Sequence, residues 1–265
     1  CYVSYAPTIR MAHATPIPVV TKAENGFVVP ASEIEAKITP KTKAILLNYP
    51  NNPTGGNMSL DDKEAIARVA VEHDLIVITD EIYSELTYGE RSPTIASLPG
   101  MRERTVFLHG FSKAYAMTGY RIGYACGPND LIEAMMKIHQ YSMLCASGFA
   151  QEAALEALLH GRREMETMRE EYRQRRNVIV KRLNEMGLEC TLPEGAFYVF
   201  PSIRSTGMSS YDFAMKLLEA KQVAVVPGTA FGECGEGHVR CAYAAGMEQI
   251  EMAMTRLHEF LQDVM

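Results

Sequence analysis

The sequence predicts an α/β fold with two parts. A larger domain built on a mostly parallel sheet is expected over residues 1–165, and a smaller α+β domain over residues 166–265. Three short apolar runs, at 43–48, 75–79 and 105–109, have the length and composition of buried parallel strands. A long, highly charged helical pattern then separates them from a fresh mixture of short strand and helix patterns. A chain of 265 residues is long enough for two such domains.

The first part begins its sheet with the run at 43–48, which a turn-rich stretch at 49–56 follows. Ser59 is placed to cap the next helix, with Asp62 as the third helical residue. The run at 75–79 then completes a strand–helix–strand unit, so the two strands should be parallel with a right-handed crossover. The run at 105–109 adds a third strand, and a shorter fourth strand is expected at 122–125.

The second part follows one long charged helix, expected from about Gly161 to Met186 and ended by Gly187. The domain boundary is placed within this helix, near residue 165. The later patterns predict strands at 189–192, 196–200, 223–226 and 238–242, a helix at 211–221 and a last helix from Glu248.

Composition excludes several classes of function. The net charge of −6 argues against nucleic acid or an anionic membrane as the main partner, and no apolar run is long enough to cross a bilayer. The six cysteines form no C-x-x-C pair and the seven histidines form no H-E-x-x-H motif, so no metal site is expected. Free thiols in a reducing compartment are the simplest account of the cysteines, which predicts a cytoplasmic protein.

Polar residues follow each of the first three predicted strands. The first strand leads to Asn52, the second to Asp80 and Tyr83, and the third to Ser112 and Lys113. Ligands of open α/β sheets bind beyond the carboxyl ends of the strands. If the strands are parallel neighbours, these side chains share one edge of the sheet.

Each of these residues also has an ordinary structural interpretation. Asp80 could be a helix cap or a Walker-B-type acidic strand end, although a carboxylate there needs a cationic partner. Lys113 could be a surface lysine, and Arg240 an arginine on a surface strand. The Asn-Pro-Thr-Gly stretch at 52–55 consists of turn formers.

In combination these motifs resemble the class I/II pyridoxal-phosphate-dependent aminotransferases of fold type I, the aspartate and aromatic aminotransferase-like enzymes. The resemblance rests on the segment at 110–123, GFSKAYAMTGYRIG, together with Asn52-Pro53-Thr54-Gly55 and the Asp80–Tyr83 pair, and it spans essentially the whole chain. It implies pyridoxal 5'-phosphate as cofactor, with Lys113 as the Schiff-base lysine that later carries a proton.

The resemblance also implies roles for the other residues. Asp80 would hold the pyridine nitrogen protonated, while Asn52 and Tyr83 would contact the phenolic oxygen. Ser112 and Arg121 would bind the phosphate, since an arginine fork suits a phosphate group. Tyr2 would stack on the cofactor ring. Arg240 would bind the substrate α-carboxylate.

Two departures from the family pattern stand out. Gly110 occupies a position where many members have a serine that contacts the phosphate. The family's glycine-rich phosphate loop, its N-terminal arm and the tyrosine lent by a neighbouring subunit have no match, so we expect the N-terminal part of a longer protein to precede Cys1. We therefore expect this chain alone to be inactive. The resemblance implies a homodimer.

The activity expected from the resemblance is transfer of an amino group from an L-amino acid to a 2-oxo acid. A carbon–sulfur lyase is the enzymatic alternative, and the segment at 116–119 favours an aminotransferase. An aminotransferase-like sensor domain of a transcription regulator is a further alternative, which a DNA-binding segment upstream would support. A P-loop nucleoside triphosphatase, suggested only by the strand that ends in Asp80, is set aside because the chain has no G-x-x-x-x-G-K-[ST] motif. The sequence does not specify the amino donor.

Overall fold

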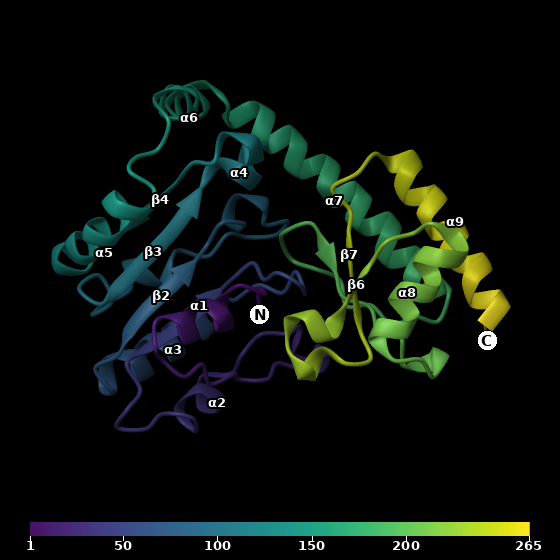
Figure 1. Ribbon diagram of the computed structural model, residues 1–265, viewed down its shortest axis with the longest axis horizontal. Helices are drawn as coiled ribbons and strands as arrows, with labels where there is room; N and C mark the ends of the chain where they lie inside the picture. The colour runs from purple at the N-terminus through teal and green to yellow at the C-terminus, as the bar shows by residue number, and fades with distance from the viewer. Residues whose placement is uncertain (265) are drawn as a thin grey trace. The chain divides into compact units, whose positions relative to one another are not determined.

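The computed structural model describes residues 1–264 as two compact units, each with its own sheet (Figure 1). The four-stranded unit comprises residues 28–50 and 58–169. The three-stranded unit comprises residues 1–27 and 51–57 and the chain from Glu170 onward. The transition at Glu170 falls inside helix α7 (Arg162–Glu185). The domain division near residue 165 stays a prediction.

The four-stranded unit has the strand order β1-β2-β3-β4. Strands β1 (Ala44–Asn48), β2 (Ile76–Asp80) and β3 (Thr105–Gly110) are parallel, which confirms the three apolar runs as buried parallel strands. Strand β4 (Gly123–Cys126) pairs with β3 in the antiparallel direction, with Gly110 opposite Gly123. The connection over 111–122 is at the short end of the length that a crossover to a parallel strand needs, about a dozen residues.

Helix α3 (Leu60–Glu72) covers this sheet and begins where the sequence predicts. The Ser59 hydroxyl accepts a hydrogen bond from the Asp62 backbone N–H, and the Asp62 carboxylate accepts one from the Ser59 backbone N–H. Buried Ile66 and Ala70 lie on its inner face. The remaining elements of the unit are α2 (Ala31–Glu35), η2 (Ser84–Leu86), η3 (Ile95–Ser97), α4 (Phe111–Ala114), η4 (Thr118–Tyr120), α5 (Asn129–Ser142) and α6 (Gly148–His160).

The three-stranded unit places β7 (Val239–Ala242) between β5 (Tyr198–Val199) and β6 (Val226–Pro227), with both pairs antiparallel. Helices α8 (Ser210–Lys221) and α9 (Met247–Val264) lie side by side, and the Phe213 and Phe260 rings meet edge to face at 5.5 Å (Figure 1). The remaining elements are α1 (Tyr5–Met11), η1 (Ala23–Asn25), η5 (Arg204–Thr206), η6 (Gly228–Phe231) and η7 (Glu233–Gly235).

Two predicted strands differ from the structure. The strand predicted at 223–226 is present only from its last residue, in β6 (Val226–Pro227). Residues 189–192 belong to no strand. Isolated hydrogen bonds, rather than a strand ladder, hold this segment in place. The Asn184 carboxamide oxygen accepts from the Cys190 N–H at 3.0 Å, and Ser202 N–H donates to the Glu189 carbonyl at 2.8 Å. The long helix, by contrast, is confirmed as α7. No helix among residues 1–264 is both long enough and apolar enough to cross a membrane.

Candidate active site

Asp80 is the last residue of β2 and lies at the carboxyl end of the four-stranded sheet. Its register partners are Asn48 on β1 and Leu108 on β3. The Asp80 Oδ1 atom accepts a hydrogen bond from the Ile82 backbone N–H at 3.1 Å, and the buried Asn48 amide donates to the Asp80 carbonyl at 3.0 Å. The neighbouring strand and the following turn therefore hold this carboxylate at the end of the strand.

Lys113 lies at the same end of the sheet, in the short helix α4 that follows β3 directly. Its Nζ atom is 5.9 Å from the centre of the Tyr83 ring, close enough for a cation–π contact. Tyr83 is buried, whereas Lys113 and the adjacent Ser112 are half-buried. The structure thus brings the predicted amine and the predicted tyrosine together beside the strand that ends in Asp80.

Arg121 follows η4 and adopts a left-handed backbone conformation, with φ of 54°. Its Nη1 atom donates to the Thr118 carbonyl at 2.9 Å, and the residue is exposed. A guanidinium has five N–H donors, so this hydrogen bond to one carbonyl leaves other donors that can bind an anionic ligand.

The structure explains why glycine rather than serine occupies position 110. A Cβ atom there would lie 3.0 Å from the Gly123 Cα and 3.1 Å from the Ile122 carbonyl oxygen. Glycine within a strand often marks such a close backbone approach. The departure from the family pattern therefore coincides with tight packing of β4 against β3.

His109 was not among the predicted site residues. Its Nε2 atom is 3.0 Å from the Ser84 hydroxyl, which joins the strand leading to Lys113 to the turn that follows Tyr83. Burial lowers the pKa of His109, so its neutral form is favoured in the folded protein. A histidine one residue before a glycine in an apolar run offers no sequence pattern that would reveal this contact.

Arg240 occupies the central strand β7 of the three-stranded unit. Its Nη1 atom donates to the Asn52 carboxamide oxygen at 3.0 Å. Its Cζ atom lies 4.6 Å from the centre of the Tyr198 ring and 5.0 Å from that of Phe231. Within residues 1–264, the buried Nε atom has no hydrogen-bond partner. A buried donor of this kind calls for an acceptor that the protein itself does not supply.

The loop at 51–56 places Asn52 beside Arg240. The Thr54 hydroxyl donates to the Asn51 carboxamide oxygen at 2.9 Å, which closes the turn. Gly55 has φ of +72°, and a Cβ atom there would lie 2.5 Å from the Pro193 Cβ. The loop can dock on the segment before β5 only with glycine at this position, and the docked loop buries Asn52.

The predicted site residues divide between the two units. Tyr2, Asn52 and Arg240 belong to the three-stranded unit, whereas Asp80, Tyr83, Ser112, Lys113 and Arg121 belong to the four-stranded unit. Tyr2 precedes α1 and meets the Tyr5 ring edge to face at 5.4 Å. Its role at the cofactor stays a prediction.

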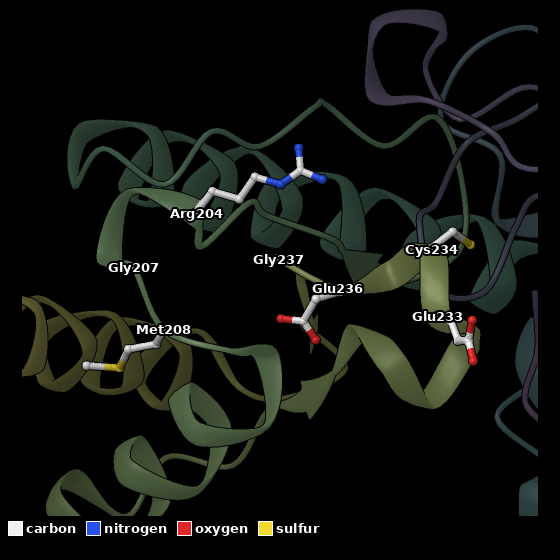
Figure 2. A pocket seen from close by; sticks show the side chains of 7 residues that line it. All are labelled: Arg204, Gly207, Met208, Glu233, Cys234, Glu236 and Gly237. Atoms are coloured by element: carbon white, nitrogen blue, oxygen red, sulfur yellow. The ribbon is translucent and has the colours of Figure 1, made fainter.

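A surface hollow in the three-stranded unit contains none of the predicted residues. It is lined by Arg204, Gly207, Met208, Glu233, Cys234, Glu236 and Gly237 (Figure 2). The Glu236 carboxylate is already engaged, because it accepts from the Ser210 backbone N–H at 2.8 Å. A separate surface group of Glu35, Glu72 and His73 brings potential metal-ligand atoms within 4.8 Å of one another, but all three residues are exposed.

Comparison with known proteins identifies the class. An aromatic aminotransferase of Pyrococcus horikoshii superimposes with a TM-score of 0.97 and 46% identity, over 99% of this chain and 71% of that one. The aspartate aminotransferase of Thermus thermophilus with maleate gives 0.93 and 40%, over 97% and 67%. The putative aminotransferase YugH of Bacillus subtilis is 52% identical over 98% of this chain and 68% of its own length.

These structural neighbours define the fold as that of the fold type I aminotransferases, with a mixed sheet. The family model for aminotransferase class I and II matches residues 1–257, and the chain belongs to this family. It is thus an aminotransferase of a family whose cofactor is pyridoxal 5'-phosphate. The residues present fit that cofactor, because an amine, a strand-end carboxylate and a buried tyrosine lie at one end of the four-stranded sheet.

Proposed function

We propose that the protein transfers an amino group from an L-amino acid to a 2-oxo acid, with pyridoxal 5'-phosphate attached to Lys113. The observation that carries this proposal is the position of the Lys113 Nζ atom, 5.9 Å from the Tyr83 ring centre at the carboxyl end of β3. Asp80 ends the neighbouring parallel strand. The family's reaction needs an amine and an acid at one such edge.

The bound cofactor supplies a reactive carbonyl and an electron-withdrawing ring, while the protein supplies orientation and charge. The Asp80 carboxylate would hold the ring nitrogen protonated. The Tyr83 hydroxyl would donate to the phenolic oxygen, and the family resemblance gives Asn52 the same partner. Ser112 and Arg121 would hold the phosphate, the arginine through its planar fork.

Lys113 would also move the reacting proton. A lysine amine that is neutral near pH 7 can serve as a general base. Once its Nζ atom is free, it would take up the proton that leaves the substrate α-carbon. Its half-buried position beside Tyr83 keeps the amine at the carboxyl end of the sheet, where the cofactor is proposed to bind. The family resemblance places Tyr2 against the face of the cofactor ring.

Arg240 would bind the substrate α-carboxylate. Its Nη1 atom is occupied by Asn52, while its buried Nε atom has no partner among residues 1–264. The Nε–Nη2 edge is therefore the edge on which a carboxylate completes the hydrogen bonding, as a bidentate pair. A clamp of this kind fixes the α-carbon in place and lowers the entropic cost of reaction.

The substrate class follows from what Arg240 can recognise. A guanidinium that binds the α-carboxylate serves every L-amino acid, and the relatives include both an aspartate and an aromatic aminotransferase at similar identity. We therefore propose L-amino acid donors and 2-oxo acid acceptors as a class. The six free cysteines support a reducing, cytoplasmic location.

We also propose a homodimer. Large apolar side chains are exposed on α5, α6 and their connection, among them Tyr141 at 87% and Phe149 at 90%. Contiguous exposed apolar surface is typical of association sites. Light scattering of the purified protein should give twice the monomer mass, and a monomer at micromolar concentration would contradict this part of the proposal.

The decisive experiment uses the complete gene product and its Lys113→Ala variant. Wild-type protein should show the visible absorption of lysine-bound cofactor and should convert 2-oxoglutarate to glutamate with at least one donor from a panel of amino acids. Lys113→Ala should lose both properties, while Lys216→Ala, which removes an exposed lysine on α8, should keep both. The absence of a visible species at any pH would refute the proposal. Release of a 2-oxo acid without an acceptor would instead identify a lyase.

A further inference from the structure

Two aromatic rings flank the guanidinium of Arg240. Tyr198 belongs to β5, one of the two strands that border β7, and Phe231 ends η6, which directly follows the other, β6. The Cζ atom of Arg240 lies 4.6 Å from one ring centre and 5.0 Å from the other. Both aromatic residues are only 7% exposed.

These contacts leave the guanidinium little freedom. Aromatic rings attract a cation to their faces, most strongly where water is excluded. The hydrogen bond from Nη1 to Asn52 fixes a third point at 3.0 Å. Two ring contacts and one hydrogen bond together fix the position and the plane of the group, while its buried Nε atom has no hydrogen-bond partner among residues 1–264.

The rings are themselves held by their neighbours. Phe231 packs with Phe27 and Phe200 in one buried cluster, where the Phe200 and Phe231 rings meet edge to face at 6.1 Å. The Tyr198 ring lies 4.8 Å from the Phe197 ring. Because each ring is packed before any ligand arrives, it can act as a fixed support for Arg240.

We propose that Tyr198 and Phe231 are positioning residues for the substrate α-carboxylate. They hold the guanidinium of Arg240 in its binding orientation in the free protein, so that substrate binding does not have to order this long side chain. This inference rests on the proposed role of Arg240, and it assigns the task to the aromatic rings rather than to the tyrosine hydroxyl.

The expected effect follows from the cost of ordering one flexible side chain on binding. That cost corresponds to a roughly 2- to 12-fold loss of affinity. Tyr198→Leu and Phe231→Leu each remove one ring and should each raise KM for the amino donor by this factor with kcat nearly unchanged, the pattern of lost uniform binding. Tyr198→Phe keeps the ring and should restore KM toward the wild-type value.

The experiment measures KM and, independently of turnover, the dissociation constant of maleate, a dicarboxylate that cannot accept an amino group. Both are measured on the complete gene product with bound cofactor. Each leucine variant should weaken maleate binding in the wild-type background. In an Arg240→Gln background the same substitutions should have no further effect, because a double-mutant cycle isolates the coupling between neighbouring residues. Phe213→Leu, which removes a buried ring between α8 and α9, serves as the control for general loss of packing and should lower Tm without changing KM.

The outcomes separate the two proposals. If Arg240→Gln does not weaken maleate binding, the proposed role of Arg240 is wrong. If Arg240→Gln weakens binding but neither leucine variant does, only the positioning role fails. The positioning role is also wrong if Tyr198→Leu weakens maleate binding equally with and without Arg240. The same conclusion follows if Tyr198→Phe weakens binding as much as Tyr198→Leu does. Either leucine variant alone is sufficient for the test if the other does not fold.

Discussion

Replacing Asn52 with aspartate should impair substrate binding by giving Arg240 a resident counter-ion. The Asn52 carboxamide oxygen accepts a hydrogen bond from the Arg240 Nη1 atom at 3.0 Å, and Asn52 is only 3% exposed. Aspartate has nearly the same shape, so Asn52→Asp keeps the acceptor but adds a negative charge next to the guanidinium. A substrate carboxylate would then meet an arginine whose charge is already neutralised.

The size of the effect can be estimated from hydrogen-bond energies. A hydrogen bond between neutral groups contributes about 0.5–1.5 kcal/mol and one to a charged group about 1.5–3 kcal/mol. The new carboxylate therefore strengthens the resident contact with Arg240 by roughly 1–2 kcal/mol. If the substrate loses a corresponding share of its attraction, KM for the amino donor should rise about 5- to 30-fold.

The assay compares Asn52→Asp with Asn52→Ala. The alanine variant removes the acceptor and adds no charge, so it should raise KM less than the aspartate variant does. Cofactor affinity is titrated separately for both variants, because the family resemblance also places Asn52 near the cofactor. The reasoning is refuted if folded Asn52→Asp protein binds cofactor and amino donor as tightly as the wild type.

Three further predictions concern the three-stranded unit. Gly228→Ala would put a Cβ atom 2.0 Å from the Gly235 carbonyl oxygen, so urea unfolding should show a loss of at least about 1–3 kcal/mol, and an unchanged midpoint would count against this packing. Burial raises the pKa of the Cys241 thiol to about 12, so at pH 8 it should be alkylated far more slowly than exposed Cys234, and mass spectrometry showing equal labelling would contradict that. Burial lowers the pKa of His238, so the folded protein binds a proton at this ring less readily than the unfolded chain, which takes one up below about pH 6.5. The free energy of unfolding should therefore fall from pH 7 to pH 5, by up to about 1.4 kcal/mol per pH unit from this group, and His238→Gln should flatten that slope.

Much of the four-stranded sheet could be predicted because its signals are local. Each of its three parallel strands is a short apolar run, and Ser59 with Asp62 marks the start of α3 by itself. The direction of β4 was not predicted, because it depends on how closely Gly110 and Gly123 approach each other. The predicted strand at 189–192 failed for a related reason: its residues suit an extended chain, but a ladder also needs a partner strand.

The chemical types of the site residues could be predicted, but their contacts could not. Asn52 and Arg240 are 188 positions apart in the sequence, and the local sequence around either residue does not predict the hydrogen bond between them. Tyr198 lies in the segment 195–198, which resembles a family segment near the substrate, but core packing explains that segment equally well, and nothing in the sequence marks Phe231. The distances from the Arg240 Cζ atom to the two ring centres are what distinguish aromatic residues that support a guanidinium from residues that only fill the core.

The loop at 51–56 shows that turn formation and function need not be competing explanations of one motif. Asn51 and Thr54 close the turn, and Gly55 takes the positive φ that lets the loop pack against Pro193. The same turn holds Asn52 against the guanidinium of Arg240. Each of these turn residues is common in turns, and their functional role here comes from the surface on which the turn packs. A substitution such as Gly55→Ala should consequently weaken the fold and displace Asn52 together, because one backbone conformation is responsible for both.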